Sequence, residues 1–441
     1  MGGAFTDKDL INMSRVCRNW RVVLMTHRPF WTRLDCKELA KTRVFIERSK
    51  PSRQLEITLK PPYDEDALDL ALREIDRVKS ISLTGRRSDL QSFSVSSLRL
   101  HAPTLRRLDI RVLSATPTTL GGLFKGDLSS LHLLRLDGVA NLPWGRLSNL
   151  TTFGFCNAAV IVNVAQLLDL FEAAPKLSNI QLKYSNLDSS NVHPNHPVVP
   201  LRSLKKFTIS ANEDSSSKLL EHLIIPAGAF LSLQLFDLSD TPFRHSLPRT
   251  PAQLENVSEI TSVYLWYGNS DIRVRLSGPS GGLSLGGFRT RRHVVTDADT
   301  SILSYFKLTG IRQLAITMNN FPPIGELDLI GILIHMPNVR TLFLNRCQIP
   351  PFISVLDVSG YGQCPRLKNL LLYVEEELPD LRGLVGGHEQ LRLVTVIKRG
   401  GFVRGETDRL KGYAGDAKYI SVGSDSRPQW DRIPDVDRSW S

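Results

Sequence analysis

Residues 177–182 read Leu-Ser-Asn-Ile-Gln-Leu, and residues 339–344 read Val-Arg-Thr-Leu-Phe-Leu. Both follow the pattern L-x-x-L-x-L, in which other apolar residues sometimes replace leucine. The pattern recurs through most of the chain and starts at Val78, Leu105, Leu131, Leu150, Leu177, Leu204, Leu233, Ile260, Ile311, Val339, Leu367 and Leu391. Successive starts lie 19 to 29 residues apart, except for one gap of 51 residues that is long enough for two periods. Repetition at such a period is typical of a solenoid.

The residues inside each unit predict one strand followed by one helix. Alternating apolar positions at the start of a unit suit a strand with one buried face. Two helix-compatible stretches, 162–174 and 327–336, end just before a proline that cannot continue a helix. We therefore expect an α/β leucine-rich-repeat solenoid over residues 51–397, a parallel sheet lining a horseshoe with helices outside. A doubly wound α/β domain is the alternative, although its strand-to-strand period usually varies more.

The gap of 51 residues contains two further strand-like pieces. They are residues 272–276 and 283–285, and they bracket the glycine-rich turn of residues 278–282. We expect one degenerate repeat here with an inserted, flexible loop, so that the sheet continues without a break. The wider glycine-rich stretch, 278–287, lacks the Gly-Lys-Ser/Thr ending that a P-loop needs to bind phosphate and magnesium.

Composition predicts a cytoplasmic or nuclear protein. The apolar content of 41% is ample for a core, and no apolar run approaches the ~18 residues of a membrane helix. Polar residues interrupt the N-terminus early, which excludes a secretory signal peptide there. The five cysteines are an odd, scattered set without C-x-x-C spacing, which predicts reduced thiols rather than a disulfide frame or a zinc site.

The net charge of +11 raises the question of nucleic-acid binding. Basic clusters such as 205–206 and 289–293 are short and spread over the chain, whereas a nucleic-acid site normally needs a continuous basic stripe. We therefore expect solvated faces and no nucleic-acid binding.

His193 and His196 lie in a Pro/Asn/Ser-rich stretch without a third metal ligand, which predicts a surface loop. No nucleophile, base and orienting group come together in the sequence, so we expect neither catalysis nor a cofactor.

The first fifty residues do not follow the repeat and predict a small helical unit. Thr6 and Asp9 suit the start of a helix in which Leu10, Met13, Cys17, Trp20 and Leu24 fall on one apolar stripe. The helix breaker Pro29 follows, and then a second helix-compatible run, 37–48. A compact unit over residues 1–50 that caps the first repeat is the expectation.

Residues 13–21, Met-Ser-Arg-Val-Cys-Arg-Asn-Trp-Arg, are followed by Pro29-Phe30-Trp31 and Leu34. This stretch resembles the second half of an F-box, whose pattern runs roughly L-x-x-V-C-x-x-W-R and then P-x-L-W-x-x-L. Residues 45–59 resemble the linker and first strand of fungal F-box proteins with C-terminal leucine-rich repeats. The leading Leu-Pro-x-Glu segment of an F-box does not precede the match, so we expect a truncated F-box with weak adaptor binding.

The resemblance implies a substrate-recognition subunit of an SCF-type ubiquitin ligase. In such a complex the F-box binds the Skp adaptor and thereby the cullin, while the repeats bind a target protein for ubiquitin-dependent degradation. Val16, Trp20 and Trp31 are the candidates for adaptor contact, and packing inside the F-box core is the alternative role for them. A leucine-rich-repeat scaffold that binds a protein without any ligase connection is the alternative function.

The repeat template also predicts which side chains meet the target. If the last two apolar positions of a template point into the core, the residues that flank them line the concave face. The candidates for partner binding chosen on this basis are Lys183, Tyr264, Trp266, Phe343 and Tyr373. Exposed Tyr and Trp favour protein recognition, although Tyr264 and Trp266 could instead cover a break in the solenoid.

For the tail, residues 398–441, we expect a short ordered cap at 419–422 and poor order after Ser424.

Overall fold

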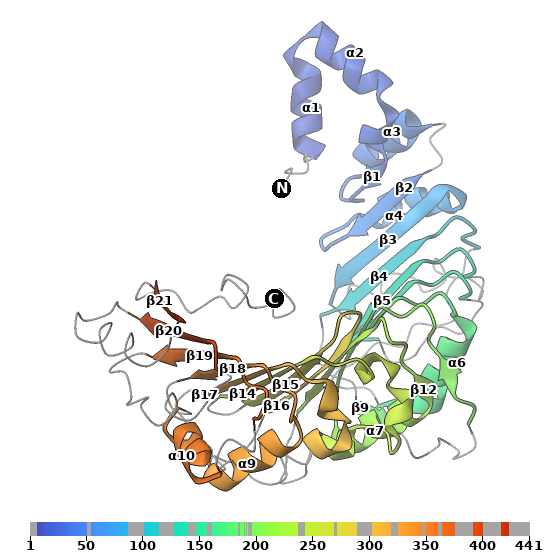
Figure 1. Ribbon diagram of the computed structural model, residues 1–441. Coiled ribbons are helices and arrows are strands. Elements are labelled where there is room, and N and C mark those ends of the chain that lie inside the picture. Colours follow the sequence, from blue (N-terminus) through green and yellow to red (C-terminus); the bar gives the residue numbers. More distant parts are fainter. Residues whose placement is uncertain are drawn as a thin grey trace. The chain divides into compact units, whose positions relative to one another are not determined.

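The computed structural model is a mixed α/β structure in which parallel strands predominate (Figure 1). It divides into two compact units, Met1–Val192 and His193–Ser441, which are described separately. This division falls inside the predicted repeat region, and the boundaries expected near residues 50 and 397 stay predictions. The structure describes residues 7–50, 54–86, 101–113, 128–139, 147–156, 161–183, 186–188, 190, 192, 196–236, 243–268, 271–288, 302–318, 325–345, 349–359, 364–374, 391–399 and 416–422.

The first unit begins with short helices rather than with one long helix. They are α1 (Asp7–Val16), α2 (Arg18–Thr26), the 3₁₀ turn η1 (Arg28–Trp31) and α3 (Leu39–Ser49). Cys17 has extended backbone angles, φ −154° and ψ 170°, and separates α1 from α2. The predicted single helix with one apolar stripe is therefore wrong. Because α2 starts anew after Cys17, Leu24 is buried whereas Cys17 and Trp20 are exposed.

The strands of the first unit pair in parallel and in chain order. They are β1 (Arg33–Leu34), β2 (Leu55–Leu59), β3 (Val78–Gly85), β4 (Arg107–Val112), β5 (Leu133–Asp137), β6 (Thr152–Cys156) and β8 (Asn179–Lys183). A small parallel pair, β7 (Ile161–Asn163) and β9 (Asn186–Asp188), adjoins them. The other helical elements are α4 (Glu65–Leu72), η2 (Ile75–Arg77) and α6 (Val164–Ala173), and the last confirms the helix predicted over 162–174.

The second unit contains a longer sheet. Its strands are β11 (Lys206–Ala211), β13 (Phe230–Leu235), β14 (Ser262–Tyr267), β15 (Asp271–Ser277), β16 (Gly282–Phe288), β17 (Gln313–Met318), β18 (Thr341–Asn345), β19 (Asn369–Val374), β20 (Leu393–Arg399) and β21 (Asp416–Val422). A short parallel pair joins β10 (Val199–Pro200) to β12 (Leu223–Ile224). The helices are α7 (Glu213–Glu221), α9 (Glu326–Ile334) and α10 (Ile349–Ser359), and the 3₁₀ turns are η5 (Phe243–Ser246), η6 (Pro251–Gln253), η7 (Glu255–Val257) and η8 (Leu308–Gly310). Figure 1 shows α7, α9 and α10 on one side of this sheet.

The region between β13 and β17 departs from the predicted repeat. β14, β15 and β16 form two successive hairpins, in which β15 runs antiparallel to both neighbours. The spatial order is β13, β16, β15, β14, β17, because β16 returns to pair with β13 and β14 pairs with β17. The two strand-like pieces are confirmed and the sheet is continuous here. A flexible insertion at residues 278–287 is wrong, since Gly278 and Gly281 close a tight turn in which the Gly278 N–H donates to the Gly281 carbonyl over 2.9 Å, and β16 follows directly. The basic run at 289–293 lies outside the described residues.

The repeat template locates the strands closely. Most strands begin two residues after a template start, as Arg107 follows Leu105 and Thr341 follows Val339. The start assigned to Leu233 is wrong, because that residue lies in the middle of β13. The helix predicted over 327–336 is confirmed by α9, and the ordered piece expected at 419–422 lies in β21. The residues after Ser424 lie outside the described part of the chain.

Side chains just before the template starts connect successive repeats. Thr104 Oγ1 donates to the Asp76 carbonyl over 2.8 Å, and Asn149 Nδ2 donates to the Ser129 carbonyl over the same distance. Asn338 Nδ2 makes the equivalent bond to Thr309 in the second unit, at 2.7 Å. These bonds satisfy turn carbonyls that the strands leave unpaired.

None of the helices in the described ranges combines the length and apolar content that crossing a bilayer requires.

Candidate functional site

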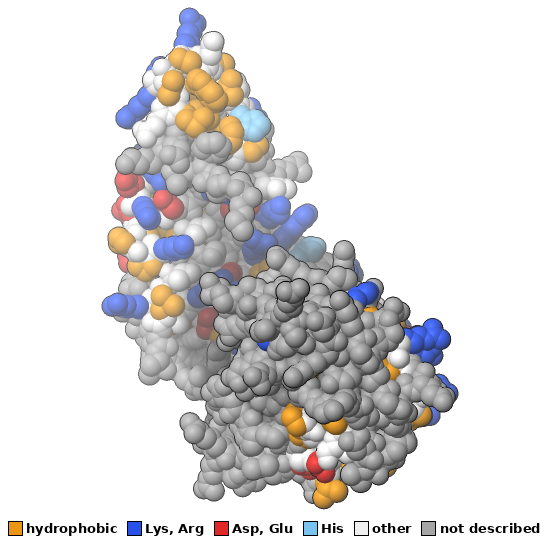
Figure 2. Space-filling model, turned by 60° about the vertical axis from the view of Figure 1, so that its left-hand side comes forward, with side chains coloured by type: hydrophobic (Ala, Val, Ile, Leu, Met, Phe, Trp, Pro, Cys, Tyr) orange, Lys and Arg blue, Asp and Glu red, His pale blue; other side chains and the backbone are white. Residues whose placement is uncertain are grey.

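The N-terminal helices carry a group of exposed apolar side chains. Val16 is 68% exposed and Trp20 is 47% exposed, and Val22, Val23 and Met25 are also exposed. Figure 2 shows hydrophobic side chains gathered at this end of the first unit, with Lys and Arg side chains around them. We call these five residues the N-terminal apolar surface. Large apolar side chains grouped in water usually mark a contact with another molecule.

Local hydrogen bonds fix the angle between α1 and α2. Arg21 Nε donates to the Ser14 carbonyl over 3.0 Å, and the backbone N–H of Trp20 lies 3.5 Å from the Cys17 sulfur that caps α2. These bonds hold Val16 and Trp20 on the two sides of the break at Cys17. The exposed positions are therefore fixed by the backbone and not by burial of the side chains themselves.

Trp31, the third predicted adaptor residue, is part of the core. Its side chain is 0% exposed, its indole N–H donates to the Leu24 carbonyl over 2.7 Å, and its ring meets Phe45 edge-on at 5.0 Å. The Arg48 guanidinium covers the ring at 4.4 Å. Trp31 therefore packs in the core against Leu24 of α2 and Phe45 of α3. Its predicted adaptor contact is wrong because its side chain is fully buried.

The charge around the N-terminal apolar surface has one sign. Arg15, Arg18, Arg21 and Arg28 are exposed, and no Asp or Glu occurs between residues 12 and 33. An apolar patch with a basic rim is complementary to an apolar groove with acidic residues on its border.

One face of the first-unit sheet carries the side chains that alternate with the buried ones, and this face is polar and charged. Arg111 on β4 holds Asp109 with two bonds, Nε to Oδ1 at 3.1 Å and Nη2 to Oδ2 at 2.9 Å. These bonds raise the pKa of Arg111. Register places Asp137 beside Arg111, then Cys156 and then Lys183 along the same row. Burial, followed by the nearby Asp137, raises the pKa of the Cys156 thiol, so this cysteine is not an activated nucleophile. Lys183 thus lies half-buried at the end of this row, and its predicted partner contact stays a prediction.

The corresponding face of the second-unit sheet is buried at its C-terminal strands, which corrects two predicted partner residues. Phe343 is 6% exposed and Tyr373 is 8% exposed. Both pack in one apolar cluster with Ala315, Leu371 and Ile397. The parallel register produces this cluster, because Phe343 lies between Ala315 and Leu371 and Tyr373 lies beside Ile397. Apolar residues in one row of a sheet pack on one another rather than facing a partner.

Tyr264 and Trp266 belong to an arginine–aromatic cluster on the same face. Antiparallel pairing sets Tyr264 opposite Arg275 and Trp266 opposite Arg273. The Arg273 guanidinium lies 4.9 Å from the Trp266 ring centre, and that of Arg275 lies 5.4 Å from the Phe230 ring centre. Stacking of this kind holds a guanidinium plane in place while its edge can still donate hydrogen bonds.

Polar partners hold the arginine–aromatic cluster in position. Asp271 accepts from Arg273 Nη2 over 3.1 Å, and the Thr317 hydroxyl donates to the Tyr264 hydroxyl over the same distance. Burial raises the pKa of Tyr264 and lowers that of Arg275. Tyr264 is partly buried against the apolar cluster described above, whereas Arg273 keeps 62% of its side chain exposed. This cluster is the best candidate for protein contact on the second-unit sheet.

The sequence contains a signal for the two arginines in the alternation of a single strand. Residues 271–277 read Asp-Ile-Arg-Val-Arg-Leu-Ser, so Arg273 and Arg275 alternate with buried Ile272 and Val274. This alternation places both arginines on one face. Their position opposite the two aromatic residues depends on the hairpin, which the repeat pattern did not indicate.

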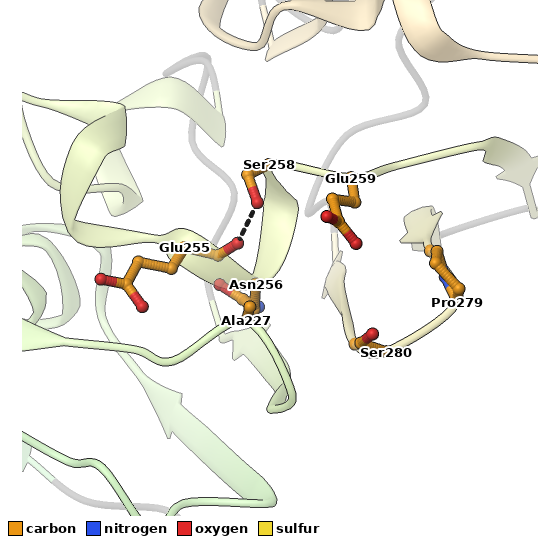
Figure 3. Close-up of a pocket in the computed structure, with 9 residues that line it drawn as sticks. Ala227, Glu255, Asn256, Ser258, Glu259, Pro279 and Ser280 are labelled. Carbon is orange, nitrogen blue, oxygen red and sulfur yellow. Dashed lines mark hydrogen bonds between the residues drawn. The ribbon is translucent and has the colours of Figure 1, made fainter.

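A small cavity lies beside the tight turn of Gly278 and Gly281 (Figure 3). It has no room even for a sphere of the size of a water molecule, so it is too small for an organic ligand. Figure 3 shows the Glu255 and Glu259 side chains pointing in different directions. The Ser258 hydroxyl donates to the Glu255 carbonyl over 2.7 Å, and Asn256 Nδ2 donates to the Gly282 carbonyl over 2.6 Å. The polar groups of this cavity therefore hold the turn.

Only part of the predicted histidine loop lies within the described residues. His193 lies outside the described residues, while the His196 ring meets His222 edge-on with ring centres 5.7 Å apart. Within the described ranges, no three residues of the types His, Cys, Asp and Glu are grouped so that they could hold a metal ion.

No model of a known protein family matches the chain, and no curated protein matches it. The surfaces described above therefore carry the functional information.

Proposed function

We propose that this protein is a substrate-recognition subunit of an SCF-type ubiquitin ligase. The N-terminal apolar surface binds a Skp adaptor, and the sheet faces bind a target protein. One observation carries the proposal: Val16 and Trp20, which match the F-box pattern, stay exposed while Trp31 of the same pattern is buried in the core. A motif that served only the core would bury all three side chains.

The strand order supports a repeat solenoid as the target-binding part. A doubly wound sheet reverses its strand order at a switch point. In the first unit, β2 to β6 and then β8 pair in chain order without a reversal. The second unit has the same order from β17 to β21. Such a module acts by positioning, because it raises the effective concentration of the target near the ubiquitin-loading machinery, and it needs no catalytic group of its own.

Calorimetry with a purified Skp adaptor tests the proposal. We expect weak binding by this chain and clear binding by a version that carries the first F-box helix ahead of α1. In that version Trp20→Ala should weaken binding by about 30-fold, since a central aromatic anchor is worth about 2 kcal/mol. The matched control is Leu327→Ala, because Leu327 is also an exposed apolar residue, at 84%, but lies on α9 in the other unit.

Each result has a distinct meaning. Equal losses for Trp20→Ala and Leu327→Ala would show that contact is not at the N-terminal apolar surface. No binding by the extended chain would remove the ligase connection and leave a leucine-rich-repeat scaffold. Circular dichroism on each variant confirms that α1 and α2 are intact.

A further inference from the structure

Four strands of the second unit place basic residues side by side at one edge of the sheet. Arg312, Arg340, Lys368 and Arg392 each come directly before a strand, β17, β18, β19 and β20 respectively. They are 24 to 28 residues apart in the sequence, which is one repeat period. No run of basic residues in the sequence reveals this group, which we call the basic ladder.

Backbone hydrogen bonds connect the members of the basic ladder directly. The N–H of Arg340 donates to the Arg312 carbonyl over 2.8 Å, that of Lys368 to Arg340 over 2.8 Å, and that of Arg392 to Lys368 over 2.8 Å. Neighbouring strands lie about 4.8 Å apart, so the four residues form a row about 14 Å long. The row lies entirely within one unit and depends on no placement of the two units.

The charges of the basic ladder have no carboxylate partner among the described residues. Arg312, Arg340 and Arg392 are exposed and Lys368 is half-buried. None of the four forms an ion pair with another residue in the described ranges. Four like charges at this spacing repel one another, which disfavours the folded state unless an anion binds. A repeated cation at one template position is therefore better suited to binding than to stability.

The residues beside the basic ladder indicate the kind of anion. The first residues of β17, β18 and β19 are Gln313, Thr341 and Asn369, which form a row of hydrogen-bonding groups. Ser262 Oγ donates to Gln313 Oε1 over 3.1 Å, and Asn369 Nδ2 donates to Thr341 Oγ1 over 3.3 Å. No aromatic side chain occurs in this row, whereas proteins that bind single-stranded nucleic acid stack bases on aromatic rings. The chemistry therefore favours carboxylates of a protein over phosphates of a nucleic acid.

The length of the ladder matches an extended peptide. Alternate side chains of an extended chain lie about 6.8 Å apart on one face, so three acidic residues at alternate positions span about 14 Å. Arg and carboxylate groups form strong, directional, charge-assisted bonds. We propose that the basic ladder binds an acidic, extended segment of the target protein, with carboxylates at alternate positions. This inference rests on the proposed role of the sheet in target recognition and names the chemistry of the segment that is held.

Fluorescence anisotropy with the full chain tests the inference. The probe is a fluorescein-labelled peptide of four Glu-Ser pairs, and a peptide of four Gln-Ser pairs is the neutral control. We expect the triple variant Arg312→Gln, Arg340→Gln and Arg392→Gln to bind the acidic peptide at least about tenfold more weakly. The matched control is Arg202→Gln, Arg244→Gln and Arg249→Gln, which removes the same charge from exposed positions of the same unit outside the ladder.

A milder variant guards against a loss of folding. Arg340→Lys keeps the charge but not the planar fork, and should weaken binding by about threefold. Binding by the unmodified chain should fall between 0.05 and 0.3 M NaCl, and the triple variant should lose most of this salt dependence. Equal losses in the two triple variants, or equal binding of the neutral peptide, would overturn the proposal.

A nucleic-acid probe separates the remaining alternative. Tighter, ladder-dependent binding of a twelve-nucleotide oligo-dT would overturn the acidic peptide in favour of a nucleic acid. The assay contains no adaptor, so its result is independent of the calorimetry. Peptide binding without adaptor binding would support the ladder on a plain scaffold, while adaptor binding without peptide binding would leave the ligase proposal and remove the ladder.

Discussion

The indole N–H of Trp31 donates to the main-chain carbonyl of Leu24 over 2.7 Å. The bond ties η1 to the last part of α2, where Leu24 is itself 1% exposed. This bond holds the indole of Trp31 in the core, whereas Trp20, in the same N-terminal helical segment, stays on the surface.

Replacement of Trp31 should destabilise the first unit. Trp31→Phe removes the N–H donor and leaves the Leu24 carbonyl unsatisfied, so we expect a loss of about 2 kcal/mol in the free energy of unfolding. The control Trp20→Phe should change it by less than about 0.5 kcal/mol, as for most exposed positions. Urea unfolding followed by far-ultraviolet circular dichroism makes the comparison, and equal losses would contradict the burial of Trp31.

The buried face of β18 and β19 gives a second prediction. Phe343→Ala should lower the free energy of unfolding by about 3 kcal/mol, because a nearly full-size cavity forms between Ala315 and Leu371. Asn345→Ala, on the same strand and only half-buried, should cost less than about 1 kcal/mol. Thermal unfolding of both variants decides whether this face is a core or a contact surface, and a small effect at Phe343 would restore the partner-binding role.

A side chain at Gly281, in the turn between β15 and β16, should lower the free energy of unfolding. A Cβ there would overlap the main-chain carbonyl oxygens of Ala227 and Ala229, which cannot move without shifting the backbone. We expect Gly281→Ala to cost about 1 to 3 kcal/mol. Gly228→Ala is the matched control, because its Cβ would meet nothing within 4 Å. Denaturant midpoints for the pair test this, and identical midpoints would argue against the hairpin.

The cysteines should differ widely in reactivity. Burial, then the charges of Asp35 and Asp64, raises the pKa of Cys36 to about 12, and burial raises that of Cys364 to about 12. At pH 8 only about one thiol in ten thousand is then ionised at these positions, and the thiolate is the nucleophile. We expect iodoacetamide to modify exposed Cys17 first and to reach Cys36 and Cys364 only after denaturation. Mass spectrometry of tryptic peptides measures the order, and early labelling of Cys36 would contradict it.

Much of the strand placement could be predicted because strand alternation is a local property. Leu108 and Ile110 are buried while Arg107, the first residue of β4, is exposed, as the template requires. Helix starts were equally local: Asn163 and Asn212 accept bonds from the N–H groups of Ala165 and Ser215 at the first turns of α6 and α7. The break at Cys17 was missed because no glycine or proline marks it.

The residues of the candidate surfaces were harder to predict, since exposure depends on neighbours that are distant in sequence. Phe343 and Tyr373 occupy outward template positions but are buried in one cluster with Ala315, Leu371 and Ile397, which adjoin them in register. Arg273 and Trp266 meet only because β15 turns back on β14.

The sequence by itself determined the period, most of the strands, the helices over 162–174 and 327–336, and the resemblance of residues 13–34 to an F-box. Each of these follows from residues within one repeat or one helix, where spacing decides which side chains share a face. Only the tertiary structure decided that Trp20 is exposed while Trp31 is buried, and that Arg312 and Arg340 become neighbours. The physical reason is that burial and charge at a position are set by what packs beside it, and parallel pairing brings together residues a full repeat apart.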